Sequence, residues 1–322
     1  MIMLKGAFGA CFAAAALLAC SPVAAQDFPT RAVHLHVGFA PGGPADIVAR
    51  IIGQKLNERW KQPVVIENRG GAGGNIAASA IAKAEPNGLA ILVSTSAFAV
   101  NQTLYKAPGY APDDLRAVVI VATTPNLIIG APTLRAKTLR DVLDAERSEK
   151  MTFGTAGVGT TPHLSAERIF RAAARGDIAH VPFTGAGPAI QAVIGGHITL
   201  ASVAMSAGVG SVQAGQVKGL AITSGKRVPA LPDVPTAREL GLGDADDSTW
   251  VALFVPGRTP ETIIDKINTD VNAILKDPTT IEQLDKIGFL PVGDRRSEAE
   301  EFVRAETKKW GSIIKTIGIE PN

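Results

Sequence analysis

Cysteine is almost missing from this sequence. Only two of its 322 residues are cysteine, Cys11 and Cys20, and both lie near the N-terminus. The rest of the chain therefore has no thiol that could form a disulfide, act as a nucleophile or bind zinc. The Gly-x-Ser-x-Gly sequence that presents the nucleophile of α/β hydrolases is missing as well. An exported hydrolase is an alternative function, but it would have to work without the usual cysteine or serine nucleophile.

An excess of charge of one sign is also missing. Lys and Arg number 32 and Asp and Glu number 30, so the formal net charge is +2. This balance provides no basic surface for nucleic acid, and we expect no nucleic-acid partner. Beyond residue 25 no apolar run is long enough to span a bilayer. With 46% hydrophobic residues, the chain can bury a large core or two domains.

The first 25 residues have the pattern of an export signal. Lys5 supplies a positive charge, residues 8–18 form an apolar run, and Val23-Ala24-Ala25 resembles a small-x-small cleavage site. We therefore expect residues 1–25 to be a signal peptide, removed near Ala25, and the protein to lie in the periplasm. Lipoprotein processing at Cys20 is the alternative, because residues 17–20 (LLAC) resemble a lipobox.

Apolar segments alternate with amphipathic segments along the rest of the chain, which predicts βαβ units and a largely parallel sheet. We expect strands at residues 33–39, 64–66, 89–93, 118–121, 127–129, 151–154, 178–181, 198–203, 220–223 and 250–255. We expect helices at residues 45–60, 75–84, 139–147, 260–275 and 298–317, and a further helix that begins after Thr161.

The alternation starts twice, which predicts two α/β lobes. Residues 26–125 form the first part of lobe 1, and residues 126–248 form lobe 2. Residues 249–322 have too few strands for a third domain, and we expect them to return to lobe 1. The chain then crosses between the lobes twice, and the cleft between such lobes is the usual place for a small ligand.

Two glycine loops each join a predicted strand to a predicted helix. They are residues 39–46 (FAPGGPAD) and residues 154–163 (GTAGVGTTPH), with Thr161 as the expected N-cap of the second helix. A glycine loop at a helix N-terminus leaves N–H groups unpaired, and the helix dipole adds partial positive charge. Such a place binds an anion without a basic side chain. The pair predicts a ligand with one or two carboxylates, and simple tight turns are the alternative.

Six stretches match one known family in the family's order. They are residues 39–50 (FAPGGPADIVAR), 64–75 (VVIENRGGAGGN), 82–88 (AKAEPNG), 154–167 (GTAGVGTTPHLSAE), 180–185 (HVPFTG) and 231–242 (LPDVPTARELGL). On these stretches the chain resembles the solute receptors of tripartite tricarboxylate transporters, the Bordetella uptake gene (Bug) family. The resemblance implies an α/β, type II periplasmic-binding-protein fold whose two lobes close on an organic acid. It also implies carboxylates held by backbone N–H groups, hydroxyls and ordered waters, and small and large membrane permease subunits as partners.

The sequence departs from the family pattern where a charge is common. Asn87 stands in place of an aspartate and Thr184 in place of a lysine. Ala192 and Thr199 occupy places that often carry aspartate in the second lobe. Because that aspartate recognises the ammonium group of amino acids, its absence argues against such ligands. An uncharged second lobe suits a carboxylate with an aliphatic or aromatic body, and we expect a dicarboxylate, with terephthalate as an aromatic candidate.

The candidate ligand-binding residues come from the two glycine loops, from the end of the third expected strand, where ligands of α/β sheets collect, and from apolar walls of the cleft. Loop solvation and core packing are the alternatives for the hydroxyls and the phenylalanines. The set is Phe39, Gly42, Gly43, Ala45, Asp46, Ser94, Thr95, Ser96, Asn101, Ala156, Gly157, Val158, Gly159, Thr160, Thr161, His163, Phe183 and Ser202.

Two members of this set have specific expectations. Asp46 lies in the first turn of its helix and should bond back to free N–H groups, because a carboxylate would repel an anionic ligand. His163 should be neutral, since a helix N-terminus disfavours the imidazolium, and should pack or donate one hydrogen bond. His34 and His36 lack further ligands at a telling spacing, so we expect no metal. Residues 70–74 (GGAGG) lack nucleotide-binding spacings, so we expect a close turn and no cofactor.

Together these observations predict a monomeric periplasmic receptor that captures a small carboxylate by hinge closure and passes it to a permease. A receptor used for signalling instead of uptake is the remaining alternative. We expect no enzymatic activity.

Overall fold

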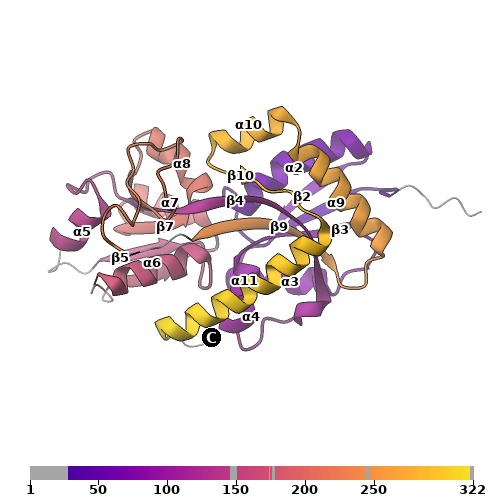
Figure 1. Ribbon diagram of the computed structural model, residues 1–322, viewed down its shortest axis with the longest axis horizontal. Coiled ribbons are helices and arrows are strands. Elements are labelled where there is room, and N and C mark those ends of the chain that lie inside the picture. The colour runs from indigo at the N-terminus through magenta and orange to yellow at the C-terminus, as the bar shows by residue number, and fades with distance from the viewer. Residues whose placement is uncertain (1–27, 146–150, 174, 176–177, 244–246, 320–322) are drawn as a thin grey trace, which may run out of the picture.

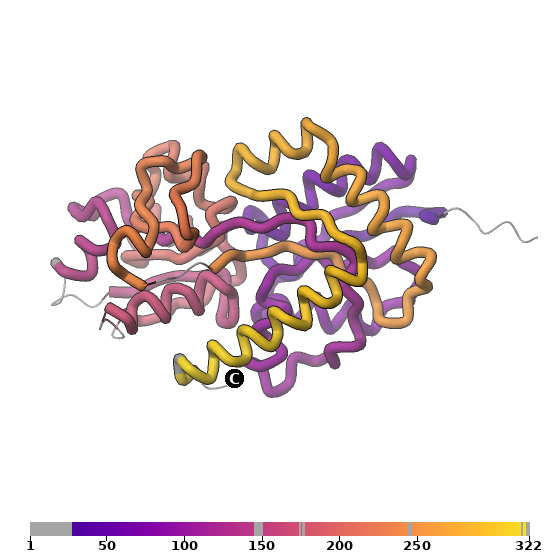
Figure 2. The backbone as a smooth tube through the Cα atoms, in the orientation of Figure 1, coloured from indigo at the N-terminus to yellow at the C-terminus, as the bar shows by residue number. Residues whose placement is uncertain are grey.

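The computed structural model describes residues 28–145, 151–173, 175, 178–243 and 247–319, and these residues form two α/β lobes (Figure 1). The expected signal peptide lies outside the described residues. Two long strands pass from one lobe to the other, as the tube in Figure 2 shows. This is the two-lobed arrangement with two crossings that the sequence predicts.

Lobe 1 has a parallel core that an antiparallel strand extends. Its elements are β1 (Val33–Val37), α2 (Pro44–Trp60), β2 (Val64–Asn68), α3 (Asn75–Ala82), β3 (Ala90–Thr95), α4 (Ala97–Leu104), β9 (Ser248–Pro256), α9 (Glu261–Leu275), α10 (Pro278–Lys286), β10 (Leu290–Pro291) and α11 (Arg296–Ile317). β1 pairs in parallel with β2 and β3, and β9 runs antiparallel to β3. Apolar side chains of α2 and α9 pack in one core, and those of α3, α4 and α11 pack in a second.

Lobe 2 repeats this plan with shorter elements. They are α5 (Leu139–Ala145), β5 (Thr152–Thr155), α6 (Thr161–Ala172), β6 (Ala179–Pro182), α7 (Ala186–Ile194), β7 (Leu200–Ala204), α8 (Met205–Gln213) and β8 (Lys218–Ile222). β5 lies in parallel between β6 and β7. Side chains of α7 and α8 fill one core and those of α5 and α6 the other, so both faces of the strands are covered.

A single strand, β4 (Leu115–Gly130), joins the two sheets. It is 16 residues long, pairs with β9 in lobe 1, and continues against β7 and β8 in lobe 2. The sequence instead predicted two strands, at 118–121 and 127–129, with the polar residues 123–126 between them. That prediction was wrong, since these residues carry the chain across the hinge while their backbone stays paired with both lobes.

Four helices were not predicted from the sequence. α4, α7, α8 and α10 have only eight or nine residues each, and most are rich in Ala, Gly, Ser and Thr. Such short segments span too few turns for the spacing of their apolar residues to indicate a helix. The N-cap of α6 is Thr160, one residue before the Thr161 that was expected, so that prediction was wrong by one position.

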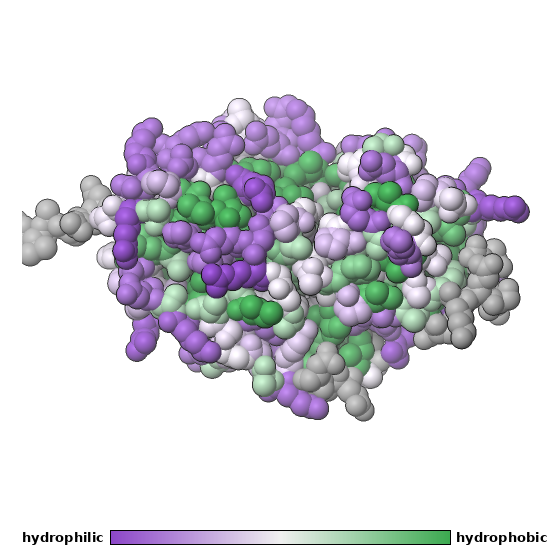
Figure 3. Space-filling model, turned by 180° about the vertical axis from the view of Figure 1, so that it is seen from behind, coloured by the Kyte–Doolittle hydropathy of each residue, from purple (hydrophilic) through white to green (hydrophobic). Residues whose placement is uncertain are grey.

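Polar residues cover most of the face shown in Figure 3, with small apolar areas between them. Within the described ranges, no helix combines the length and apolar character that a bilayer crossing needs.

Candidate functional site

A pocket lies between the lobes, where the two glycine loops meet. Its lining comes from both lobes and from β9: Phe39, Gly43, Pro44, Thr95, Ala156, Thr160, Pro162, Ala186, Ala204 and Thr249. Its volume is about 20 Å³, counted as space for the centre of a water-sized sphere. That is room for about one water molecule, so little space is left between the lobes at this point.

Four helices begin at this pocket, and their N-cap residues are Gly43 (α2), Thr160 (α6), Gly185 (α7) and Ala204 (α8). None of these N-caps has a side chain that hydrogen-bonds to the first turn. The helix dipoles therefore place partial positive charge around the pocket. At α8 the first turn is partly satisfied, because the Ser206 N–H donates to Thr124 Oγ1 at 3.3 Å. Among the described residues, no side chain bonds to the first-turn N–H groups of α2, α6 and α7. Because no described lining residue is charged, the backbone is the group that would attract an anion.

Asp46 stabilises the first glycine loop. Its carboxylate accepts hydrogen bonds from the Gly42 N–H at 3.0 Å and from Asn68 Nδ2 at 3.0 Å, and it forms an ion pair with Arg50 at 2.9 Å. Burial opposes its ionisation, yet the hydrogen bonds from Arg50, Gly42 and Asn68 hold the pKa of Asp46 below its ordinary value. Asp46 therefore bonds back to the loop as expected, and the Gly42 N–H is already used inside the loop.

The second glycine loop is tied to its own strand. Thr155 Oγ1 accepts from the Gly157 N–H at 3.2 Å, and Thr160 Oγ1 donates to the Gly157 carbonyl at 2.9 Å. The φ angles of Gly157 and Gly159 are +135° and +84°, where a side chain would be strained. The loop is therefore held by its own hydrogen bonds, and it presents Ala156 and Thr160 to the pocket.

His163 lies in the first turn of α6, next to the second loop, and does not line the pocket. Its Nδ1 accepts from the Gly159 N–H at 3.4 Å, and its ring stacks on His180 with the ring centroids 4.0 Å apart. Burial, and to a lesser degree His180, lower the pKa of His163 to about 3, and burial lowers the pKa of His180 to about 4. The ring is neutral as expected, but towards this loop it accepts a hydrogen bond, because Nδ1 is the atom that faces Gly159.

Five of the predicted residues line the pocket: Phe39, Gly43, Thr95, Ala156 and Thr160. The other predicted residues lie in the loops, cores and hydrogen-bond networks around it: Gly42, Ala45, Asp46, Ser94, Ser96, Asn101, Gly157, Val158, Gly159, Thr161, His163, Phe183 and Ser202. Asn101 Nδ2, for example, donates to the Gly73 carbonyl at 2.9 Å and supports the turn before α3. Ser202 Oγ donates to the Pro162 carbonyl at 2.8 Å and thereby supports the start of α6.

Five lining residues were missed: Pro44, Pro162, Ala186, Ala204 and Thr249. Pro162, Ala186 and Ala204 lie at the starts of helices in lobe 2, and none of the five missed residues is charged. Only their position along the chain could have indicated them, since α6, α7 and α8 each follow a short strand.

Glycines form the rim where the lobes touch. We call Gly70, Gly73, Gly185 and Gly187 the glycine seam. A Cβ at each position would lie 2.8 Å from an atom across the rim: Thr184 O, Val158 O, Ala40 Cβ and Pro41 O, in that order. The Ala40 N–H also donates to the Thr184 carbonyl at 3.0 Å. The lobes therefore meet backbone to backbone, at a distance that side chains would prevent.

The described residues contain no group of three or more His, Cys, Asp and Glu that could hold a metal ion. His34 Nδ1 lies 2.7 Å from Glu67 Oε1, and His36 Nδ1 lies 3.5 Å from Glu67 Oε2. These contacts join β1 to β2, which gives both histidines a structural role.

Comparison with known proteins assigns the family. The profile of the tripartite tricarboxylate transporter family receptor matches residues 48–319. The chain belongs to this receptor family. The receptor is 31% identical to the protein BugT of Bordetella pertussis over 304 residues, which cover 92% of this chain and 93% of BugT. The resemblance to the Bug family is thereby confirmed.

Two solved structures support the same assignment. An R. palustris protein determined with adipate is 33% identical to the receptor, with a TM-score of 0.87, over 92% of this chain and 100% of that chain. MatC from Rhodopseudomonas palustris with bound malate is 31% identical, with a TM-score of 0.82, over 89% of this chain and 100% of that chain. The expected fold, periplasmic-binding-protein class and solute-receptor class are confirmed.

Proposed function

We propose that this receptor captures a small dicarboxylate in the periplasm and delivers it to the membrane permease of a tripartite tricarboxylate transporter. One observation carries the proposal: four helix N-termini, three of them with no side-chain hydrogen bond to the first turn, surround a pocket whose described lining has no charged residue. Their dipoles and N–H groups suit carboxylates. The adipate and malate of the two R. palustris structures are dicarboxylates, which supports this ligand class.

The positions of the four helices favour two carboxylates over one. α2 belongs to lobe 1, whereas α6, α7 and α8 belong to lobe 2, so each lobe offers its own anion-attracting group. Between these groups the pocket has the apolar surfaces of Phe39, Pro44 and Pro162. An apolar spacer, aliphatic as in adipate or aromatic as in terephthalate, suits that environment.

Ligand contacts from both lobes would favour the closed state. We propose that residues 26–125 and 249–322 move as lobe 1 against residues 126–248 as lobe 2, after removal of residues 1–25. β4 and β9 connect the two bodies, and the glycine seam allows them to approach closely.

Calorimetry and thermal-shift measurements on residues 26–322 test the proposal. Adipate, malate and terephthalate are the test ligands, and dimethyl adipate is the matched control because it keeps the spacer and loses both charges. At least one diacid should raise the melting temperature with concentration by mass action, and the diester should not. Equal stabilisation by diester and diacid, or no stabilisation by any C4 to C8 diacid, would overturn it.

A further inference from the structure

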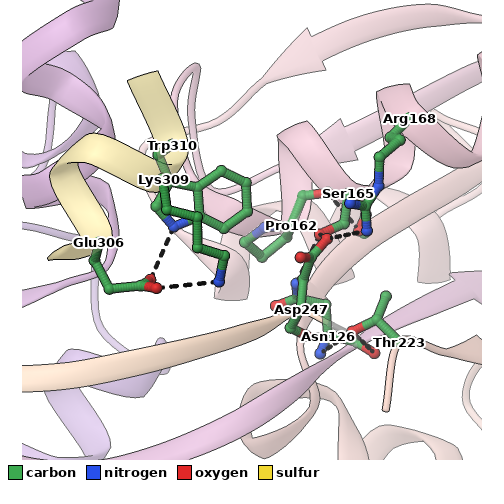
Figure 4. Close-up of polar contacts among 10 residues, drawn as sticks. Asn126, Pro162, Ser165, Arg168, Thr223, Asp247, Glu306, Lys309 and Trp310 are labelled. Atoms are coloured by element: carbon green, nitrogen blue, oxygen red, sulfur yellow. Dashed lines mark hydrogen bonds and ion pairs between the residues drawn. The ribbon is translucent and has the colours of Figure 1, made fainter. Parts of the chain in front are cut away.

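A continuous chain of buried polar side chains runs from lobe 1 through the hinge into lobe 2. From the lobe 1 end it consists of Ser96, Thr161, Thr249, Asn126, Ser165, Asp247 and Arg168, the first six of them at most 4% exposed. The consecutive donor–acceptor distances are 2.9, 2.7, 2.8, 3.1, 3.0 and 2.6 Å. Figure 4 shows its lobe 2 end, where Arg168 and Ser165 converge on Asp247.

The carboxylate at one end fixes where each hydrogen lies. The carboxylate of Asp247 has no hydrogen to give, so Ser165 Oγ donates to it and must accept from Asn126 Nδ2. That turns Asn126 Oδ1 towards Thr249, which therefore donates to it.

The same logic continues to the other end of the chain. Because the hydrogen of Thr249 is used, Thr161 donates to Thr249, and Ser96 donates to Thr161. All the hydroxyl hydrogens of the chain point towards Asp247.

This direction decides which hydroxyls of the pocket can donate to a guest. Three lining residues carry a hydroxyl, namely Thr95, Thr160 and Thr249. Thr249 donates to Asn126, and Thr160 donates to the Gly157 carbonyl. Thr95 Oγ1 accepts from the Ala97 N–H at 3.3 Å, and no hydrogen bond among the described residues uses its own hydrogen.

We propose that Arg168 and Asp247 are positioning residues, although they do not line the pocket. They turn the hydroxyl hydrogen of Thr249 away from the ligand. Thr95 is then the residue whose hydroxyl donates to a ligand carboxylate. The proposal rests on the proposed carboxylate-binding function. Thr95 is then a specificity-determining residue, and the affinity that its hydroxyl contributes depends on Asp247.

The first test is a neutron structure of the unliganded, deuterium-exchanged protein. Deuterons are expected on Thr161 directed at Thr249, on Thr249 directed at Asn126, and on Ser165 directed at Asp247. A deuteron on Thr249 directed at Thr161 would overturn the proposal. This result does not depend on any ligand, so it also holds if carboxylate binding fails.

The second test is calorimetry with the diacid that binds the wild-type protein. Thr95→Val should weaken binding about tenfold or more, since it removes a hydrogen bond to a charged group, whereas Thr95→Ser should stay within about threefold. In an Asp247→Leu background the chain can reverse and release the hydrogen of Thr249. The penalty of Thr95→Val should then shrink at least about threefold.

Asp247→Asn is the conservative control, because its carbonyl oxygen still accepts from Ser165 while the charge is lost. It should keep the full penalty of Thr95→Val. Equal penalties in all three backgrounds, or a Thr95→Val variant that binds like wild type, would overturn the proposal. If wild-type protein binds no diacid, the proposed function fails, and the neutron structure alone decides the direction of the chain.

Discussion

Alanine in place of a seam glycine should hold the lobes apart. At Gly185 a Cβ would lie 2.8 Å from Ala40 Cβ and 3.0 Å from Ala40 N, and at Gly187 it would lie 2.8 Å from Pro41 O. The φ of Gly185 is 174°, which is extended backbone open to any residue. Gly187 lies in the first turn of α7, where alanine favours a helix over glycine. The clash therefore exists only when the lobes are closed.

The size of the effect follows from the overlap. Forcing one extra carbon into a packed contact costs about 1–3 kcal/mol, and every 1.4 kcal/mol is tenfold in affinity. Gly185→Ala and Gly187→Ala should therefore each weaken diacid binding by about 5- to 150-fold. The unliganded protein should keep or slightly raise its melting temperature, since the open state has no clash.

Calorimetry gives the affinity, and small-angle X-ray scattering with saturating ligand gives the separation of the lobes. Gly210→Ala is the matched control, because Gly210 lies in α8 and a Cβ there would meet nothing within 4 Å. Wild-type affinity in both seam variants would refute the reasoning. It would mean that, with ligand bound, the lobes do not come close enough for the seam residues to touch.

Three further variants test other parts of the structure. A histidine whose pKa in the folded protein lies below the unfolded value of 6.5 takes up a proton on unfolding. Because of His163, the free energy of unfolding therefore falls as the pH drops from 6.5 towards about 3. In urea unfolding at several pH values, His163→Phe should reduce this pH dependence by up to about 1.4 kcal/mol per pH unit. Asp270→Ala should cost about 1–3 kcal/mol in urea unfolding, because the buried Trp60 Nε1 loses its acceptor at 2.6 Å. Asp46→Ala should lower stability by about 1–3 kcal/mol and weaken diacid binding, because the first loop loosens.

Each of these predictions has an outcome that contradicts it. A pH slope in His163→Phe equal to that of wild type would mean that His163 is charged in the folded protein. Asp294, whose pKa burial raises to about 6, affects both proteins alike, so the difference isolates His163. A loss below about 0.5 kcal/mol in Asp270→Ala would show that Trp60 finds another partner. Tighter diacid binding in Asp46→Ala would assign to Asp46 a repulsive role in place of its loop-stiffening role.

The larger features of lobe 1 could be predicted because their periodicity is strong. In α2 the apolar residues Val48, Ile52 and Leu56 recur at helical spacing and are fully buried. The polar residues 123–126 interrupt the apolar pattern of β4, so the pattern indicated two strands where the structure has one. Thr124 Oγ1 accepts from the Ser206 N–H, and the Asn126 N–H donates to Thr223 Oγ1, so polar side chains are satisfied inside the hinge.

Two of the four helix N-termini at the pocket could not be predicted. α7 and α8 have nine residues each, AGPAIQAVI and MSAGVGSVQ, and span too few turns for a helical spacing to stand out. Main-chain groups are the same in every residue type, so the sequence did not indicate that Ala186 and Ala204 line the pocket. What the sequence did provide was the position of two glycine loops, and the pocket lies where they meet.

The starts of α2 and α7 have a consequence for the empty protein, because their N-caps are glycines without a capping side chain. A glycine N-cap leaves a helix roughly a few tenths of a kcal/mol less stable than a capping side chain does, and under the proposed function a bound carboxylate would restore that share of stability. Under the proposed function, the starts of these helices would therefore open more readily in the empty protein than in the loaded one.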